Sequence, residues 1–91
     1  MKSKVVNEEL SGLCKALAHP VRVQILQILL ERRCLCRDVV NALPLAQSTV
    51  SEHLRILKDA GLIQDEADGP RRAYCVNQRL LERLKALIAA L

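Results

Sequence analysis

The sequence predicts a mainly α-helical chain with one small β-hairpin. Three observations lead to this fold class. Apolar residues recur at helical spacing along most of the chain, and a run of charged and turn-forming residues, "DEADGPRR", separates two short strand-like segments. Aromatic residues are nearly absent, since Tyr74 is the only one among 91 residues. A core must therefore be built from Leu, Ile, Val and Ala side chains.

Length and charge narrow the class further. A chain of 91 residues predicts a single domain spanning residues 1–91, because so short a chain cannot divide its core. Its net charge of +4 suits an anionic partner but is also common on ordinary protein surfaces. The shortage of aromatic residues argues against folds that stack single-stranded nucleic acid. An enzyme is not expected, because no nucleophile is paired with a base and no phosphate-binding loop is present.

The cellular compartment follows from the apolar segments. The N-terminal "MKSKVVNEEL" has no apolar stretch long enough for a signal peptide, and no later segment is free of charge over membrane-spanning length. We therefore expect a cytoplasmic protein with no membrane partner. Because the cytoplasm is reducing, the four cysteines are not expected to form a disulfide framework, which leaves metal binding, redox sensing and simple burial as their roles.

The first half of the chain reads as helices around one short strand. Asn7, followed by two glutamates, predicts the cap of a first helix over residues 7–18. Pro20 can begin a second helix, whose "VRVQILQILL" segment is apolar nearly all the way round and is therefore expected to lie at the centre. The "RRCLC" segment suits a short strand, and "RDVVNAL" predicts a short helix that stops before Pro44.

The second half predicts a helix, a hairpin and a final helix. A helix over Gln47–Ala60 carries an apolar stripe of Val50, Leu54 and Leu57, and Gly61 is expected to end it as a C-cap. The segment "LIQDEADGPRRAYCV" predicts two strands around an Asp-Gly-Pro turn, and "QRLLERLKALIAAL" predicts the last helix. Two helices joined across "PLA" and followed by a basic hairpin predict a winged helix-turn-helix.

Three segments of the chain resemble a known family in order and spacing. "LCKALAHPVRVQIL", "LPLAQSTVSEHLRILKDAGLI" and "GPRRAYCV" are similar to the signature segments of the ArsR/SmtB family of metal-responsive winged-helix repressors. The resemblance covers nearly the whole chain and implies a homodimer with the first and last helices as its interface. Composition favours the same arrangement, because a small core cannot cover both apolar terminal stripes. The alternative is that both stripes pack on the central helix.

The same resemblance predicts which residues contact double-stranded DNA. The helix over Gln47–Ala60 would lie in the major groove, and two-fold symmetry predicts an inverted-repeat operator with half-sites about one helical turn, or a multiple of it, apart. The alternative is that its polar face is only solvated. We expect bases and phosphates to be contacted by Gln47, Ser48, Thr49 and Ser51, phosphates by His53 and Arg55, and the backbone or minor groove by Arg71 and Arg72.

The cysteines suggest a site for a soft ion, because thiolates are soft ligands. Cys34 and Cys36 are two residues apart in the sequence. On a helix their side chains would point in different directions, whereas on a strand they would lie on the same face. A strand "RCLC" paired with "AYCV" would bring them together with Cys75, provided that Leu35 faces the core as Tyr74 does. Three thiolates suit trivalent arsenic or antimony, whereas structural zinc usually takes four ligands.

The family's best-known arsenic site has its third cysteine three residues after the pair, where this chain has Val39, or Val40 when the alignment is made on Asp38. We therefore assign Cys75 as the third ligand. Cys14 falls on the apolar face of the first helix and is expected to be buried, or otherwise to reach a site in the other subunit. A second family site, built from His and carboxylates on the last helix, has no equivalent, because the only histidines are His19 and His53.

These observations predict a repressor that releases its operator when arsenite or antimonite binds its thiolates, with cadmium and copper(I) as other candidate inducers. One alternative keeps the fold and the DNA binding but makes the thiols a redox or persulfide switch. An alternative of another class is a small zinc-binding scaffold for protein partners.

Overall fold

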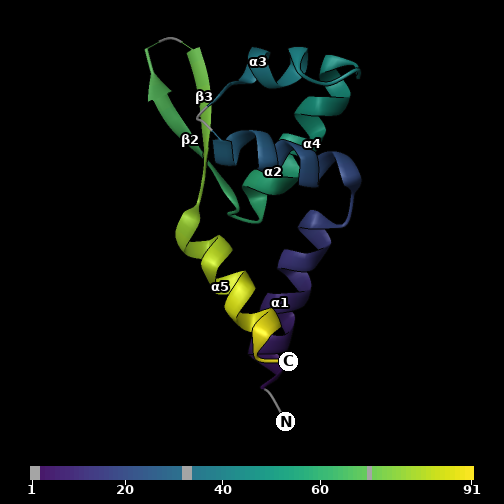
Figure 1. The fold of residues 1–91 in the computed structure, drawn as a ribbon, viewed down its shortest axis with the longest axis vertical. Coiled ribbons are helices and arrows are strands. Elements are labelled where there is room, and N and C mark those ends of the chain that lie inside the picture. Colours follow the sequence, from purple (N-terminus) through teal and green to yellow (C-terminus); the bar gives the residue numbers. More distant parts are fainter. Residues whose placement is uncertain (1–2, 32–33, 70) are drawn as a thin grey trace.

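The computed structural model describes residues 3–31, 34–69 and 71–91, and of Cys34, Ala67 and Asp68 it describes the backbone alone. The described residues form five helices and three strands, arranged as a mainly helical body with a projecting hairpin (Figure 1). In chain order the elements are α1 (Lys4–Leu17), α2 (Pro20–Glu31), β1 (Cys34–Leu35), α3 (Cys36–Asn41), α4 (Gln47–Asp59), β2 (Ile63–Asp68), β3 (Arg71–Val76) and α5 (Gln78–Ala89). The predicted fold class is confirmed.

Helix α1 begins earlier than the sequence predicts. Ser3 is its N-cap, and the Ser3 hydroxyl accepts a hydrogen bond from the backbone N–H of Val6 at 3.2 Å. The predicted cap at Asn7 is therefore wrong, because Asn7 already lies inside the helix and its N–H bonds to the carbonyl of Ser3. Serine competes well with asparagine for this position, and the earlier cap adds a full turn to the helix.

Helices α2 and α4 pack against each other at the centre of the core. Ile25, Leu26 and Leu29 of α2 are buried, as the apolar character of this segment predicts. The predicted stripe of α4 is confirmed, since Val50, Leu54 and Leu57 are buried while the opposite face of the helix stays exposed. This packing holds α4 rigidly in place and leaves its polar face to solvent.

The three strands form an antiparallel sheet in the order β1-β3-β2. The turn of the hairpin contains Gly69 with φ of 62°, a left-handed conformation that glycine adopts without strain. The predicted pairing of "RCLC" with β3 is confirmed, but the strand has only two residues, with Cys34 opposite Tyr74 and Leu35 opposite Ala73. Cys36 already belongs to α3.

Helices α1 and α5 lie side by side at the end of the molecule opposite the hairpin (Figure 1). The Arg83 guanidinium donates two hydrogen bonds of 2.7 Å to the Glu9 carboxylate and so joins the two helices. Their outer surface keeps apolar side chains in solvent: Val5 is 76% exposed, Ile88 49% and Leu91 87%. The chain therefore does not cover both terminal stripes by itself.

No helix within the described ranges is by itself long and apolar enough to cross a membrane; α1 and α2, bent by 91° at their junction, meet the length and composition criteria only as a pair.

Candidate DNA-binding face and cysteine site

The first two turns of α4 present a row of polar side chains. Gln47, Ser48, Thr49 and Ser51 are all exposed, as the sequence predicts. Ala46 precedes the helix and makes no side-chain cap, and the first turn carries no acidic residue. The positive end of the helix is therefore not neutralised by its own side chains, which suits an approaching phosphate.

Two exposed arginines begin β3, and both line a pocket that Gln47 also lines. The Arg72 guanidinium lies 3.4 Å from an Asp65 carboxylate oxygen and 5.7 Å from the centre of the Tyr74 ring. Lys58 of α4 forms an ion pair with the same carboxylate, and its hydrogen bond is the main reason that the pKa of Asp65 is lowered. The ion pair between α4 and β2 fixes the hairpin relative to α4, so Arg71 and Arg72 keep a defined position beside it.

Arg55, also expected to contact phosphate, is engaged within its own helix. Its guanidinium donates to the Glu52 carboxylate, including a 3.0 Å bond from Nε, and to Asp59 at 2.8 Å. The bond from Arg55 lowers the pKa of Glu52, so this carboxylate stays ionised at neutral pH and balances the arginine. A phosphate would have to displace these partners, so we expect Arg55 to add less to DNA affinity than an arginine without them.

The structure argues against the predicted phosphate contact of His53. This side chain is partly buried, its Nδ1 lies 3.1 Å from an Arg22 Nη atom, and its ring centre is 4.4 Å from that of His19. The Arg22 Nε atom also donates to the carbonyl of Ala16, at 2.6 Å. Arg22 therefore connects the end of α1 to α4. Sequence reasoning did not predict this role, because it depends on a contact between residues 31 positions apart.

This arrangement predicts a pH dependence of stability. Burial, followed by the charges of His19 and Arg22, lowers the pKa of His53 below its usual 6.5. The folded protein therefore favours the neutral ring, and between the two pKa values the unfolded chain binds more protons. The stabilisation from neutral His53 is complete above pH 6.5 and is lost as the pH falls through the folded-state value.

Thermal unfolding measured between pH 5 and 8 checks this expectation. In His53→Asn the amide oxygen can replace Nδ1 as acceptor without titrating, so its melting temperature should fall less on acidification than that of the wild type. His19→Asn removes only the second cause of the lowered His53 pKa and leaves burial in place, so it should keep more of the wild-type slope than His53→Asn does. Equal slopes in the wild type and His53→Asn would contradict the assignment.

The structure corrects the predicted arrangement of Cys34 and Cys36. The strand ends at Leu35, and Cys36 is the first residue of α3, so no shared strand face holds both cysteines. Leu35 is partly exposed and lies outside the core. Cys36, in contrast, packs against the core. The premise that Leu35 faces the core is therefore wrong. The side chain of Cys34 is outside the described residues.

Cys75 occupies the predicted face of β3. Tyr74 and Val76 are buried and Cys75 is only partly so, as strand alternation requires. Cys14 is exposed in this chain, so its predicted burial is wrong for the single subunit. Within the described residues, no group of three or more His, Cys, Asp or Glu side chains could hold a metal ion. The three-thiolate set stays a prediction.

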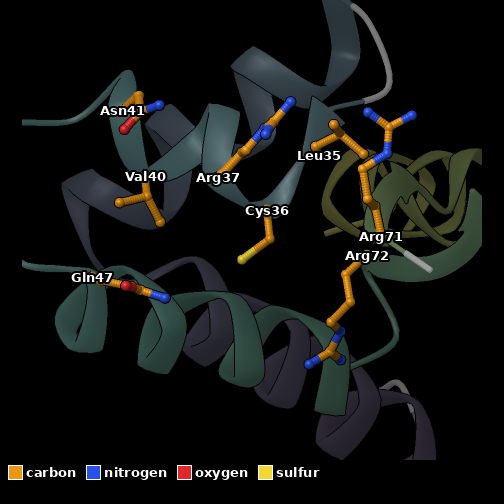
Figure 2. A pocket seen from close by; sticks show the side chains of 8 residues that line it. All are labelled: Leu35, Cys36, Arg37, Val40, Asn41, Gln47, Arg71 and Arg72. Carbon is orange, nitrogen blue, oxygen red and sulfur yellow. The ribbon is translucent and has the colours of Figure 1, made fainter.

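A pocket of about 400 Å³ lies between α3, α4 and β3. Figure 2 shows the sulfur of Cys36 and the side chain of Val40 pointing into this pocket from α3, with Gln47 and Arg72 beside α4. The sequence analysis missed the pocket, because its walls come from segments far apart in the chain. Its lining residues are Leu35, Cys36, Arg37, Val40, Asn41, Gln47, Arg71 and Arg72.

Sequence comparison identifies relatives with regulatory roles. Residues 19–65, just over half of the chain, match the family described as bacterial regulatory protein, arsR family. An uncharacterised HTH-type transcriptional regulator of Methanocaldococcus jannaschii is 35% identical over 86% of this chain and 90% of its own length. The HTH-type transcriptional repressor SmtB of Mycobacterium tuberculosis is 44% identical, and the match covers 68% of this chain and 46% of that protein. The arsenical resistance operon repressor of Staphylococcus xylosus is 32% identical over 82% of this chain and 72% of its own.

Solved structures agree with these matches. One solved structure is the crystal structure of a possible transcriptional regulator for arsenical resistance, which is 30% identical in sequence. Its superposition covers 87% of this chain and 81% of the solved chain, with a TM-score of 0.76. The homodimeric winged helix-turn-helix DNA-binding domain of a possible ArsR-family regulator from Mycobacterium bovis is 27% identical, covers 99% of this chain and 86% of its own, and has a TM-score of 0.79. The chain therefore belongs to the arsR family of bacterial regulatory proteins, as a DNA-binding transcriptional regulator and not an enzyme.

Proposed function

We propose that this chain is a homodimeric, cytoplasmic repressor that binds an inverted-repeat operator and releases it when trivalent arsenic or antimony binds its cysteine thiolates. One observation carries the DNA-binding part: the exposed polar start of α4 and the two arginines of β3 border the same pocket. Gln47 and the hydroxyl residues after it can read base edges, while Arg71 and Arg72 can neutralise phosphates. Both groups are held on rigid elements, because α4 is buried on its other face and the hairpin is joined to it by Lys58 and Asp65.

The exposed apolar surface of α1 and α5 supports a dimer. Val5, Ile88 and Leu91 would be covered if a second copy packed against these helices. A two-fold axis through this surface would place two copies of α4 on DNA, which is what an inverted repeat requires. The similar Mycobacterium bovis domain is itself homodimeric.

The cysteines and the arsenical resistance repressor of Staphylococcus xylosus support a metalloid inducer. Cys34 and Cys36 lie at the junction of β1 and α3, and Cys75 lies on the neighbouring strand β3. Because Cys36 begins α3, an ion held by both Cys34 and Cys36 would bind at the first turn of this helix. Binding there would shift α3 against α4 and the hairpin, and so couple the ion to the DNA-binding face.

Fluorescence anisotropy of a labelled operator duplex, selected in vitro, tests the metalloid response. Arsenite should lower the operator affinity of the wild type by a factor of about 5 to 150, the range of a coupling free energy of about 1–3 kcal/mol. Cys34→Ser, Cys36→Ser and Cys75→Ser should bind the operator and lose this response, while Cys14→Ser should keep it.

The cysteine variants also separate the competing assignments. A full response in Cys75→Ser together with none in Cys14→Ser would replace Cys75 by Cys14 of the partner copy. Release by mild peroxide or a persulfide, with no effect of arsenite, antimonite, cadmium or copper(I), would favour the thiol switch. Failure to bind any duplex, with partner binding that is insensitive to salt, would favour the zinc-binding scaffold, because phosphate contacts impose a steep salt dependence.

A further inference from the structure

The pocket between α3, α4 and β3 is lined by both cationic and apolar side chains. Among the described residues that line it, three are arginines, two are amides and none is acidic. Its apolar wall consists of Leu35, Cys36 and Val40. We propose that this pocket binds a small organic anion, whose acidic group pairs with the arginines while its apolar part lies against that wall, and that the bound anion competes with DNA.

The arrangement of the side chains suits an anion with a planar or tetrahedral acidic group. Figure 2 shows Gln47 near one end of α4 and the Arg72 guanidinium near the other end, while the side chains of Arg37 and Arg71 extend from α3 and β3 away from α4. A guanidinium group can donate two parallel hydrogen bonds to a carboxylate or phosphate, and the Gln47 amide can donate a further one. The Asp65 oxygen lies 3.4 Å from Arg72, a long contact that leaves this guanidinium able to take another acceptor.

The size and the apolar wall favour an organic anion over an inorganic one. A pocket of about 400 Å³ is within the usual range for small-molecule sites. Inorganic phosphate would satisfy the arginines but leave Val40 and Cys36 facing water. An anion with an aromatic or aliphatic body would cover this wall and gain the free energy of apolar burial.

Competition with DNA follows from residues that serve both surfaces. Gln47, Arg71 and Arg72 line the pocket and are also the proposed contacts with bases and phosphates. An anion held there would occupy the same hydrogen-bond donors and repel the DNA backbone. This competition rests on the proposed function, whereas binding of the anion does not. Neither step uses a thiolate as a ligand, so the anion site can be tested in the metal-free protein.

Protection of Cys36 from alkylation measures binding directly. The reduced, metal-free protein is treated with iodoacetamide at constant ionic strength, and each cysteine is followed by peptide mass spectrometry with fragmentation. Phenyl phosphate and benzoate should slow alkylation of Cys36, whose sulfur points into the pocket. Cys14 is the internal control, because it is exposed on α1 and its rate should not change.

Matched ligands and variants define the specificity. Phenol, which has the ring without the charge, should not protect Cys36, and inorganic phosphate should protect less than phenyl phosphate at equal concentration. Arg37→Gln should require about fivefold more phenyl phosphate for half-protection, because one charged hydrogen-bond donor is lost. Arg79→Gln removes the same charge from the exposed surface of α5 and should leave protection unchanged. Equal protection by phenol, or equal behaviour of the two variants, would overturn the proposal.

Operator binding supplies the second arm of the test. The apparent dissociation constant for the operator duplex should rise linearly with the phenyl phosphate concentration, as expected for a competitor. Protection of Cys36 with unchanged operator affinity would overturn the competition. Protection by duplex DNA alone, with none from phenyl phosphate or benzoate, would show that the pocket accepts only DNA phosphates and would overturn the small-anion site. A chain that binds phenyl phosphate but no duplex would contradict the proposed function and not the anion site.

Discussion

Replacing Arg71 and Arg72 together by glutamine should reduce operator affinity about a hundredfold near physiological salt. Each arginine that contacts a phosphate releases counterions from the DNA, and its loss removes that contribution. The logarithmic dependence of affinity on salt should therefore become shallower by about two for each subunit. Anisotropy titrations of one operator duplex at several salt concentrations measure both quantities.

A matched variant controls for net charge. Arg79→Gln combined with Lys85→Gln removes two positive charges from the exposed surface of α5, away from α4 and the hairpin. It should change operator affinity much less than the pair on β3 does, once both variants have been shown to remain dimers. If the two double variants lose equal affinity and equal salt dependence, the hairpin arginines contribute only general charge, and their assigned contact is incorrect.

Leu57→Ala should lower the free energy of unfolding by about 2–5 kcal/mol, the usual cost of removing a large buried side chain. Leu57 is fully buried, at 0% exposure, on the face of α4 that packs on the core. The truncation removes apolar contacts and leaves a cavity beneath the DNA-binding helix. Urea denaturation followed by circular dichroism, at a fixed protein concentration, gives the change.

Leu45→Ala provides the comparison for this core substitution. Leu45 precedes α4 and is 37% exposed, so its truncation should cost less than about 1 kcal/mol. Similar losses of unfolding free energy in the two variants would mean that the apolar stripe of Val50, Leu54 and Leu57 does not anchor α4. Operator affinity measured under conditions where both variants stay folded would then show whether the position of α4 depends on this packing.

Local sequence patterns were enough to predict most of the fold. The α4 stripe of Val50, Leu54 and Leu57, the end of that helix at Gly61, and the hairpin turn at Gly69 all agree with the structure. These features depend on contacts between neighbouring residues or on the spacing of apolar side chains, which a sequence displays directly. The start of α1 was misplaced because Ser3 and Asn7 are both good caps, and local propensity alone does not choose between them.

The candidate sites were predicted unevenly, for a physical reason. Exposure of the polar residues at the start of α4 followed from helical periodicity and agrees with the structure. The cysteine geometry depended on where a two-residue strand ends, and a shift of one residue exchanges the faces of a strand. The structure places Cys36 on α3 and packs it against the core, opposite to the prediction.

The sequence by itself determined the family, the order of the elements and the exposure of the polar residues at the start of α4, because these follow from local motifs and periodicity. Only the tertiary structure decided that Arg22 joins His53 to α1, that Leu35 lies outside the core, and that Arg72 and Gln47 border one pocket with Cys36. Each of these contacts joins residues distant in the chain. Their partners are fixed by packing and strand register, which depend on the whole fold and not on any single segment.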